Sequence, residues 1–283
     1  MSSASPTAYD MKLALPLAGF LTAFFAAPLA ILFLLSLQVD PKGSAYGLIQ
    51  YTNFLGDLFS LGVLGSTLLL GLEVTALCLL LGYPVAWIYT RSGPKVRSLI
   101  ILIVLLPLLT SVVVRTFAWI VILGRQGIVN STLLSLGLAE TPLKLLYTQG
   151  GLIVALAQVQ MPLTILPLIT AIGRIDPNLG DASASLGAGQ WRTFVKIMLP
   201  LSLPGIIAGA MLTYAASITA FITQSLVGGG QMLFMPMYLY QQASTLQNWP
   251  FAAAISIIFL VAVLAVVTLF NLLGRLSRGY ANA

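Results

Sequence analysis

Six apolar stretches alternate with short polar segments along the chain. They cover roughly residues 13–36, 61–89, 98–123, 149–172, 204–226 and 251–273. A helix needs about 20 mostly apolar residues to cross the hydrocarbon layer, and its backbone must satisfy its own hydrogen bonds there. The pattern therefore predicts an all-α membrane protein with six transmembrane helices. We expect one domain over residues 1–283, with its main polar loop at 173–203.

Composition supports the bilayer as the solvent of this chain. Hydrophobic residues make up 59% of the 283 residues and charged residues 7%, with a mean hydropathy of +1.00. An ordinary soluble domain is about 25% charged. The chain has no histidine and one cysteine, Cys78, inside an apolar stretch, so we expect neither an internal disulfide nor a metal site. Cys78 is expected to be a small buried side chain.

The placement of the cations predicts the orientation. If the N-terminus is cytoplasmic, nine of the 13 Lys and Arg residues fall on the cytoplasmic side, three on the outer side, and Arg115 within a span. Cytoplasmic loops of membrane proteins carry the excess of positive charge. Both termini and the 173–203 loop are therefore expected in the cytoplasm of a bacterial inner-membrane protein. The basic charge is accounted for by topology, and no nucleic-acid partner is expected.

The cytoplasmic loop contains the sequence DASASLGAGQWRTFVKIMLP at residues 181–200. Asp176 and Pro177 are typical of a helix start, and Gly187 is typical of a helix end. A second short helix is predicted over 190–199, with Trp191, Phe194, Val195 and Met198 on one face. Pro200 and Pro204 are expected to end this segment before the fifth span. From the residues alone, the loop is either an interfacial linker or a docking element whose small side chains let a partner approach closely.

The spacing of this loop resembles the EAA loop of the type I (MetI-like) permeases of binding-protein-dependent ABC importers. Asp181, Ala182 and Ser183 stand where that loop has Glu-Ala-Ala, and Gly187 and Ala188 supply its Gly-Ala pair. Asp for Glu and Ser for Ala are departures from the pattern. Further residues match the offsets of the loop, namely Phe194, Ile197, Leu199 and Pro200. The segments GSTLLLGLEVTALCLLLGYPVAWI (65–88) and VRTFAWIVILGRQGIVN (114–130) look like those of spermidine/putrescine-type members.

The resemblance implies a fold, a role and partners. It implies the MetI-like permease fold, with Asp181–Ala188 as the helix that couples to an ATPase and Trp191, Phe194 and Pro200 as its support. The implied partners are two ATP-binding subunits, which hold ATP and Mg²⁺, a periplasmic solute-binding protein, and a second permease subunit, different or identical. This chain itself is expected to bind no cofactor.

Catalytic motifs are absent from the sequence. There is no GxxxxGK[ST] phosphate loop and, without histidine, no Ser/His or Cys/His constellation. We therefore expect no catalytic residues and no enzymatic activity in this chain.

A few polar side chains inside the spans are candidates for the solute pathway. Charges within a membrane are costly and usually face the bundle interior or a water-filled cavity. Glu73 and Arg115 lie at similar depths and are expected either to pair structurally or to line the route. The other candidates are Trp119 in the third span and Tyr214, Thr219 and Gln224 in the fifth, where Ser217 and Thr223 also lie.

The solute is expected to be small, polar and organic: polyamine-like, opine-like or related. The polyamine-type permeases that the chain resembles often have an acid near the segment that corresponds to ITAFITQSLVGGG (218–230), and its absence here weighs against a polycation. An ion-coupled secondary transporter with six helices is the main alternative; it would need a titratable site within the membrane, for which Glu73 with Arg115 is a candidate. A membrane scaffold without transport activity is a third possibility.

Overall fold

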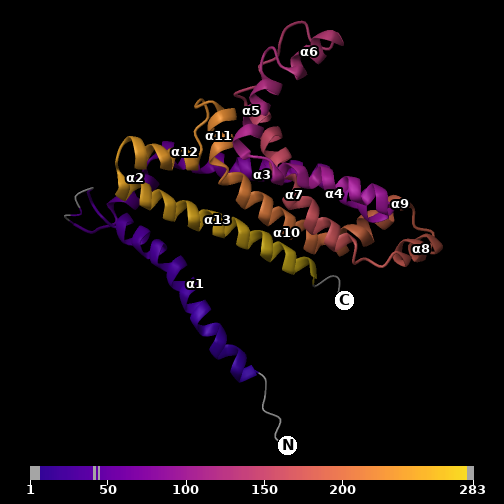
Figure 1. The fold of residues 1–283 in the computed structure, drawn as a ribbon, viewed down its shortest axis with the longest axis horizontal. Coiled ribbons are helices and arrows are strands. Elements are labelled where there is room, and N and C mark those ends of the chain that lie inside the picture. The colour runs from indigo at the N-terminus through magenta and orange to yellow at the C-terminus, as the bar shows by residue number, and fades with distance from the viewer. Residues whose placement is uncertain (1–6, 41–42, 44, 279–283) are drawn as a thin grey trace, which may run out of the picture. The chain divides into compact units, whose positions relative to one another are not determined.

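A computed structural model describes residues 7–40, 43 and 45–278, with side chains described for 15–40, 43 and 45–274. The helices run in the following order: α1 (Thr7–Ser36), α2 (Ile49–Gly56), α3 (Leu58–Arg91), α4 (Pro94–Leu109), α5 (Val112–Leu123), α6 (Ile128–Ser135), α7 (Gln149–Ile172), α8 (Asn178–Ser185), α9 (Gln190–Thr193), the π-helical turn η1 (Phe194–Met198), α10 (Leu199–Ile218), α11 (Phe221–Gly228), α12 (Met235–Tyr240), the π-helical turn η2 (Gln241–Thr245) and α13 (Trp249–Arg278) (Figure 1).

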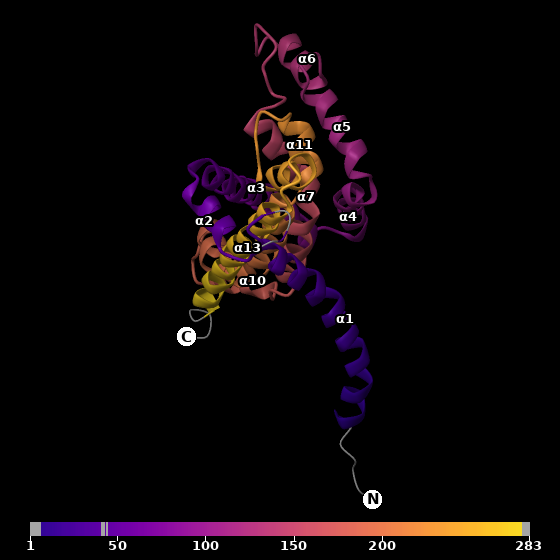
Figure 2. The same ribbon diagram turned by 90° about the vertical axis from the view of Figure 1, so that its left-hand side faces the viewer.

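Six stretches of helix among the described residues are long and apolar enough to cross a membrane. They are Leu15–Ser36, Leu58–Arg91, Val112–Ser135, Gln149–Ile172, Gln190–Ile218 and Trp249–Gly274. The predicted helical fold with six candidate spans is confirmed. The bounds differ most for the third stretch, because the expected span 98–123 is divided between α4 and α5. Thr110 and Ser111 have extended backbones there, and Figure 2 shows the chain changing direction between the two helices.

The chain divides into two compact units. One comprises residues 1–61 with 239–260, and the other comprises 62–238 with 261–283. The expected single permease domain over 1–283 stays a prediction. In the first unit, Ser36 Oγ and Tyr51 Oη lie 2.6 Å apart, and the Gln50 amide donates to Val39 O at 2.9 Å. These bonds hold α2 against the segment that follows α1.

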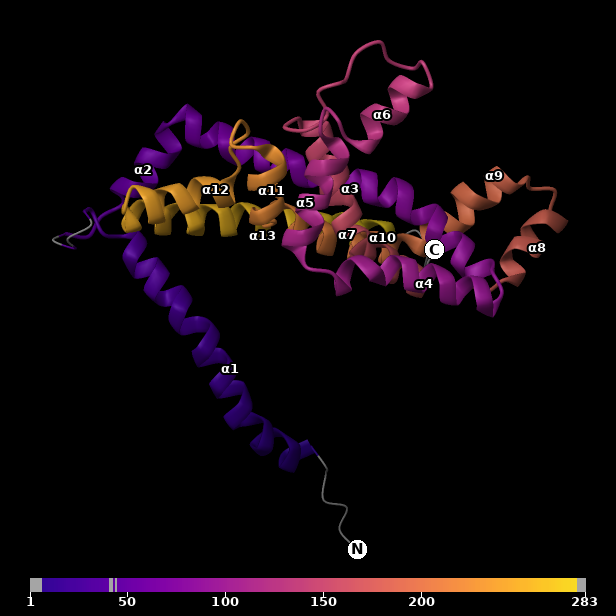
Figure 3. The same cartoon turned by 45° about the horizontal axis from the view of Figure 1, so that its top comes forward.

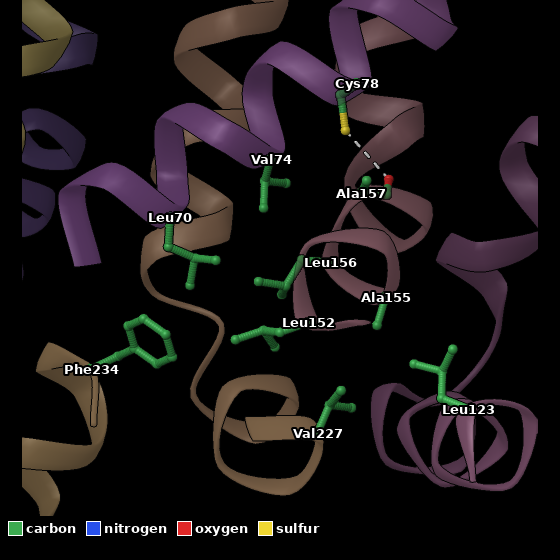
Figure 4. Packing of buried hydrophobic residues seen from close by; sticks show 10 residues of the cluster. All are labelled: Leu70, Val74, Cys78, Leu123, Leu152, Ala155, Leu156, Ala157, Val227 and Phe234. Carbon is green, nitrogen blue, oxygen red and sulfur yellow. Dashed lines mark hydrogen bonds between the residues drawn. The ribbon is translucent and has the colours of Figure 1, made fainter. Parts of the chain in front are cut away.

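The core of the larger unit forms around α7. Its apolar side chains pack with those of α3, α5 and α11 and with Phe234, just before α12, in a cluster that contains Leu70, Val74, Cys78, Leu123, Leu152, Ala155, Leu156, Ala157, Val227 and Phe234 (Figure 4). Cys78 is fully buried, and its thiol donates to Ala157 O at 3.4 Å. The expectation of a small buried cysteine is confirmed.

The α7 and α10 helices approach each other closely in the middle of this unit (Figures 1 and 3). A Cβ at Gly209 would lie 3.0 Å from Thr164 O, and one at Gly205 would lie 2.8 Å from Pro167 O. Thr164 and Thr213 share a hydroxyl hydrogen bond of 2.5 Å across the same interface. Small residues and hydroxyl pairs of this kind stabilise helix pairs in membranes, where apolar burial provides little drive.

Candidate functional site

The predicted helix of the 173–203 loop is α8, and Asp176 opens it. The Asp176 carboxylate accepts the backbone N–H of Asn178 at 2.9 Å, and Pro177 is the N-cap, with right-handed helical backbone angles, immediately before the first helical residue. Asp176 bonds to the first turn as expected, whereas Pro177 lies one position before the expected first helical residue. Figure 3 shows α8 and α9 at the end of the larger unit where α3 finishes and α4 begins.

Gly187 closes α8 with a Schellman turn. Its φ is +79°, in the left-handed region. The N–H of Gly187 donates to Ala184 O at 2.9 Å, and the N–H of Ala188 donates to Ser183 O at 3.1 Å. This pair of bonds satisfies carbonyls that the helix leaves free at its end. The predicted Gly turn is present, and it fixes where the chain leaves α8.

A hydroxyl pair joins the two arms of the loop. Ser183 is buried, and its Oγ lies 2.8 Å from Thr193 Oγ1 on α9. Asp181, Ala182 and Gly187 are exposed, whereas Ala188 is half-buried. Leu186, between Ser185 and the turn, is 89% exposed. The loop is therefore a braced hairpin of two short helices with an apolar side chain at its tip.

The expected support face of the second helix is only partly as predicted. Met198 is buried and Phe194 half-buried, but Val195 is exposed and Trp191 is 76% exposed. Trp191 still stacks on Phe194, with ring centroids 5.6 Å apart. Phe194 in turn contacts Tyr83 and Trp87 of α3 edge-on, at 5.5 and 6.1 Å. Phe194 is thus the residue that anchors the loop to α3.

The expectation that Pro200 and Pro204 end the segment is wrong. The chain stays helical from Gln190 to Ile218, through both prolines. The π-helical turn η1 precedes Pro200, and Leu199 N–H donates to Phe194 O, five residues back. The wider turn gives the proline ring room beside the preceding carbonyls, with which it would clash in a regular α-helix.

A cavity of about 1180 Å³ lies between this loop and the ends of α3 and α7. Aromatic side chains of α3 and of the loop line it, namely Tyr83, Trp87, Trp191 and Phe194. Tyr83, Trp87 and Arg91 are not among the site residues predicted from the sequence. Their spacing of four residues, which places side chains on one helix face, was the available indication.

The two charges inside the spans have different partners. The Gln149 amide donates to Glu73 Oε2 at 2.6 Å. Arg115 donates to Pro107 O and contacts Thr110 Oγ1 at 3.4 Å, so it covers the end of α4. The structure does not bring Glu73 and Arg115 together as a pair. Both side chains are half-buried.

A second helix break lies in the expected fifth span 204–226, between α10 and α11. Ala220 leaves the helical region, and the Gln224 amide donates to Ser217 O at 2.9 Å and Ile218 O at 3.2 Å. Gln224 therefore satisfies carbonyls at the end of α10. Thr223, beside it, shares a hydroxyl bond of 3.2 Å with Thr116 of α5. Within the described residues, Arg115 Nε and Gln224 Oε1 are buried without a hydrogen-bond partner.

The remaining candidates are scattered. Tyr214 is fully buried, and its ring meets Phe270 edge-on at 5.7 Å. Trp119 donates to Gln158 Oε1 at 3.2 Å, and Thr219 is exposed and bonds back to Ala215 O. Arg115 and Gln224 lie on the two helices that the Thr116–Thr223 bond joins, each next to one of the bonded threonines. A role of any of these side chains in solute passage stays a prediction.

The family of the chain follows from its match to a family model. The model described as "Binding-protein-dependent transport system inner membrane component" matches residues 4–278. The chain belongs to this family. Its members are permease components of transport systems, so the expectations of a multi-pass inner-membrane protein and of no enzymatic activity are confirmed.

Several relatives agree with this assignment. The chain is 35% identical to the spermidine/putrescine transport system permease protein PotB of Haemophilus influenzae, over 74% of this chain and 72% of the relative. It is 34% identical to PotB of Escherichia coli K12 (75% and 77% covered) and 30% identical to the molybdenum permease ModB of the same species (76% and 95%).

A bacterial ABC transporter involved in alginate import has the same fold, with a TM-score of 0.73 over 94% of this chain and 95% of that one, at 19% identity. The same kind of transporter in complex with an alginate-bound periplasmic protein gives 0.70 over 94% and 96%, at 21% identity.

Proposed function

We propose that this permease is the membrane subunit of an ATP-driven importer that carries polyamine-class organic cations from the periplasm to the cytoplasm. The α8 hairpin couples it to two ATPase subunits. A periplasmic binding protein delivers the solute, and a second permease chain, different or identical, completes the pathway. ATP binding draws the coupling hairpins together and turns the cavity outward, and hydrolysis resets it.

The α8 hairpin carries the coupling part of the proposal. A helix that transmits force must be short, rigid and able to approach its partner closely. The Schellman turn at Gly187 and the Ser183–Thr193 bond brace it. Leu186 leaves an apolar side chain 89% exposed in a polar loop. Burial of such a side chain in a partner groove would contribute about 1.5–3 kcal/mol to docking.

The expected orientation supports an ATPase on the hairpin side. In the predicted topology several cations lie on the same side as the hairpin, at the end of α3, at the start of α4 and in the loop: Arg91, Lys95, Arg97, Arg174 and Arg192. Positive charge of this kind marks the cytoplasmic side. We place both termini and the hairpin in the cytoplasm, where ATP is available.

The relatives support the solute class. Two PotB proteins, whose names give spermidine and putrescine, are 34–35% identical to this chain over about three quarters of it. Glu73 provides a half-buried carboxylate within α3, which suits a cationic solute. The same family includes a molybdenum permease at 30% identity, so an oxyanion is the sharpest alternative to test. Membership of the family favours ATP-driven import over the ion-coupled alternative.

Reconstitution tests the proposal directly. The chain is placed in proteoliposomes with its ATPase, second permease and binding protein, and uptake of putrescine, molybdate and octopine is measured with and without ATP. We expect ATP-dependent uptake of putrescine only. Uptake without ATP would refute the coupling role, and uptake of molybdate or octopine instead would refute the solute class.

Leu186→Asp tests the docking hairpin separately. We expect the ATPase to be lost on purification, because the charge would enter an apolar groove. The matched control is Leu138→Asp, since Leu138 is also highly exposed, at 71%, but belongs to the loop after α6. Retention of the ATPase by Leu186→Asp would show that α8 is not the docking element.

A further inference from the structure

The cavity between the α8 hairpin and the ends of α3 and α7 has the composition of a binding site. Its volume of about 1180 Å³ exceeds the roughly 300–1,000 Å³ of ordinary small-molecule sites, so it has room for an elongated ligand together with water. Its walls combine aromatic rings with a small number of charged groups. Such a combination is typical of sites that select a ligand by charge and shape.

The aromatic wall of the cavity consists of four rings from α3 and the loop. Trp87 and Tyr83 lie nearly parallel, with an interplanar angle of 20° and centroids 6.5 Å apart, and Phe194 meets both edge-on. Trp191 extends the wall at the mouth of the cavity, where it is 76% exposed. Ring faces carry partial negative charge and attract ammonium and guanidinium groups.

One cation already occupies this wall. Arg91 Cζ lies 3.8 Å from the centroid of the Trp87 ring. Arg91 belongs to the last turn of α3, one turn after Trp87, and it also lines the cavity. The indole face of Trp87 can therefore bind a positive charge, and Arg91, which would compete with a bound cation, already covers it.

The charge balance of the cavity favours a positive ligand. Asp176 and Asp181 line it and are both exposed, and Arg91 is the only cation among its lining residues. One Asp176 oxygen accepts the Asn178 N–H at the start of α8, so the carboxylate is held in place. Two carboxylates against one guanidinium give the lining a net charge of −1.

We propose that this cavity is a second, hairpin-side binding site for a linear organic diamine or polyamine, in which Trp87 and Trp191 hold one ammonium group and Asp181 and Asp176 hold another. The ligand displaces Arg91 from Trp87 on entry. The solute class is taken from the proposed function, and the site lies outside the intramembrane candidates considered there. On the proposed topology it receives the cation on the cytoplasmic side.

Equilibrium binding of radiolabelled putrescine to the assembled transporter in nanodiscs tests the site, without ATP and without the binding protein. The neutral isostere 1,4-butanediol serves as competitor. We expect saturable putrescine binding that butanediol does not displace. Displacement by butanediol would show an apolar cleft without cation selectivity and would overturn the proposal.

Four variants test whether the cavity selects a positively charged ligand. Trp191→Leu, at a highly exposed position that leaves the fold intact, is expected to weaken binding about 2- to 30-fold, the range of one cation–π contact. Asp181→Asn is expected to weaken it as well. Arg91→Gln is expected to strengthen it, because it removes both the competitor and the positive charge. Trp249→Leu, outside the cavity lining, is the matched control and should bind like the unaltered chain.

Weaker putrescine binding in Arg91→Gln would show that Arg91 does not compete for the Trp87 face and would overturn the proposal, as would unchanged binding in Trp191→Leu. The outcome is independent of the uptake assay. Putrescine that binds with this variant pattern but is never transported would refute the proposed solute and leave the site standing. ATP-driven putrescine uptake without binding to the cavity would refute the site alone.

Discussion

Replacement of Gly187 by alanine isolates the turn that ends α8. The residue has a φ of +79°, and a Cβ built there would meet nothing within 4 Å. Steric contacts therefore contribute nothing, and the whole cost is the left-handed backbone. For a residue with a Cβ this costs about 1–2 kcal/mol. Because 1.4 kcal/mol is about tenfold in an equilibrium, the turn would lose roughly 5- to 30-fold in population relative to open conformations.

The loss has a defined structural consequence. Opening the turn breaks the bonds from Gly187 N–H to Ala184 O and from Ala188 N–H to Ser183 O. The path of the chain between α8 and α9 is then no longer fixed, although both helices remain. We expect Gly187→Ala to lower ATP-dependent uptake several-fold in proteoliposomes, with the amount of inserted permease unchanged because the position is exposed. ATP hydrolysis should become less dependent on the binding protein.

Two variants make this prediction specific. Gly189→Ala is the matched control, because Gly189 has a φ of −68° and a Cβ there would also meet nothing within 4 Å. It should transport normally. Gly187→Asn should retain more activity than Gly187→Ala, since asparagine tolerates the left-handed region best among residues with a Cβ. Equal uptake by Gly187→Ala and Gly189→Ala would refute the argument that the left-handed turn is needed for coupling.

Three further changes test the packing. Gln224→Leu removes the amide that covers the end of α10 and should cost about 1–3 kcal/mol per uncovered group, seen as a lower Tm in detergent. Gly205→Ala forces a Cβ to within 2.8 Å of Pro167 O and should lower Tm, whereas Gly65→Ala, with open space, should not. Hydrogen bonds from the Ser60 hydroxyl and backbone N–H lower the pKa of the Asp57 carboxyl in the folded protein. The stabilisation that these bonds provide is present above the unfolded-state pKa and is lost as the pH falls through the folded-state pKa. Asp57→Asn should therefore lower Tm at neutral pH and have no effect in acid.

The features that the sequence predicted well are local ones. Asp176 and Gly187 act through backbone groups only a few residues away, and each takes the role that its residue type indicated. The helical fold and the six candidate spans follow from runs of apolar residues long enough for a bilayer. Both kinds of inference need no knowledge of how distant segments pack, which is why they hold.

The helix breaks and the proline-containing helix were not predictable in the same way. Thr110 and Ala220 lie inside apolar stretches whose composition is as suitable for a continuous span as for a broken one. Pro200 indicated a helix end, but the π-helical turn before it removes the clash on which that prediction depended. The partner of Glu73, Gln149, is 76 residues away, so only tertiary packing identifies it.

The two helix breaks explain why polar side chains stand where they do in these apolar stretches. Arg115 and Gln224 each follow a break by one helical turn and donate back to carbonyls of the helix before it. In lipid an uncovered carbonyl is as unfavourable as a buried polar side chain without a partner, so each residue offsets a cost that the break creates. Thr116 and Thr223, the immediate neighbours of the two, then join α5 to α11 by a hydroxyl bond. A polar or charged side chain close to a helix break is therefore weak evidence for a solute pathway, because it is already explained by the uncovered carbonyls to which it donates.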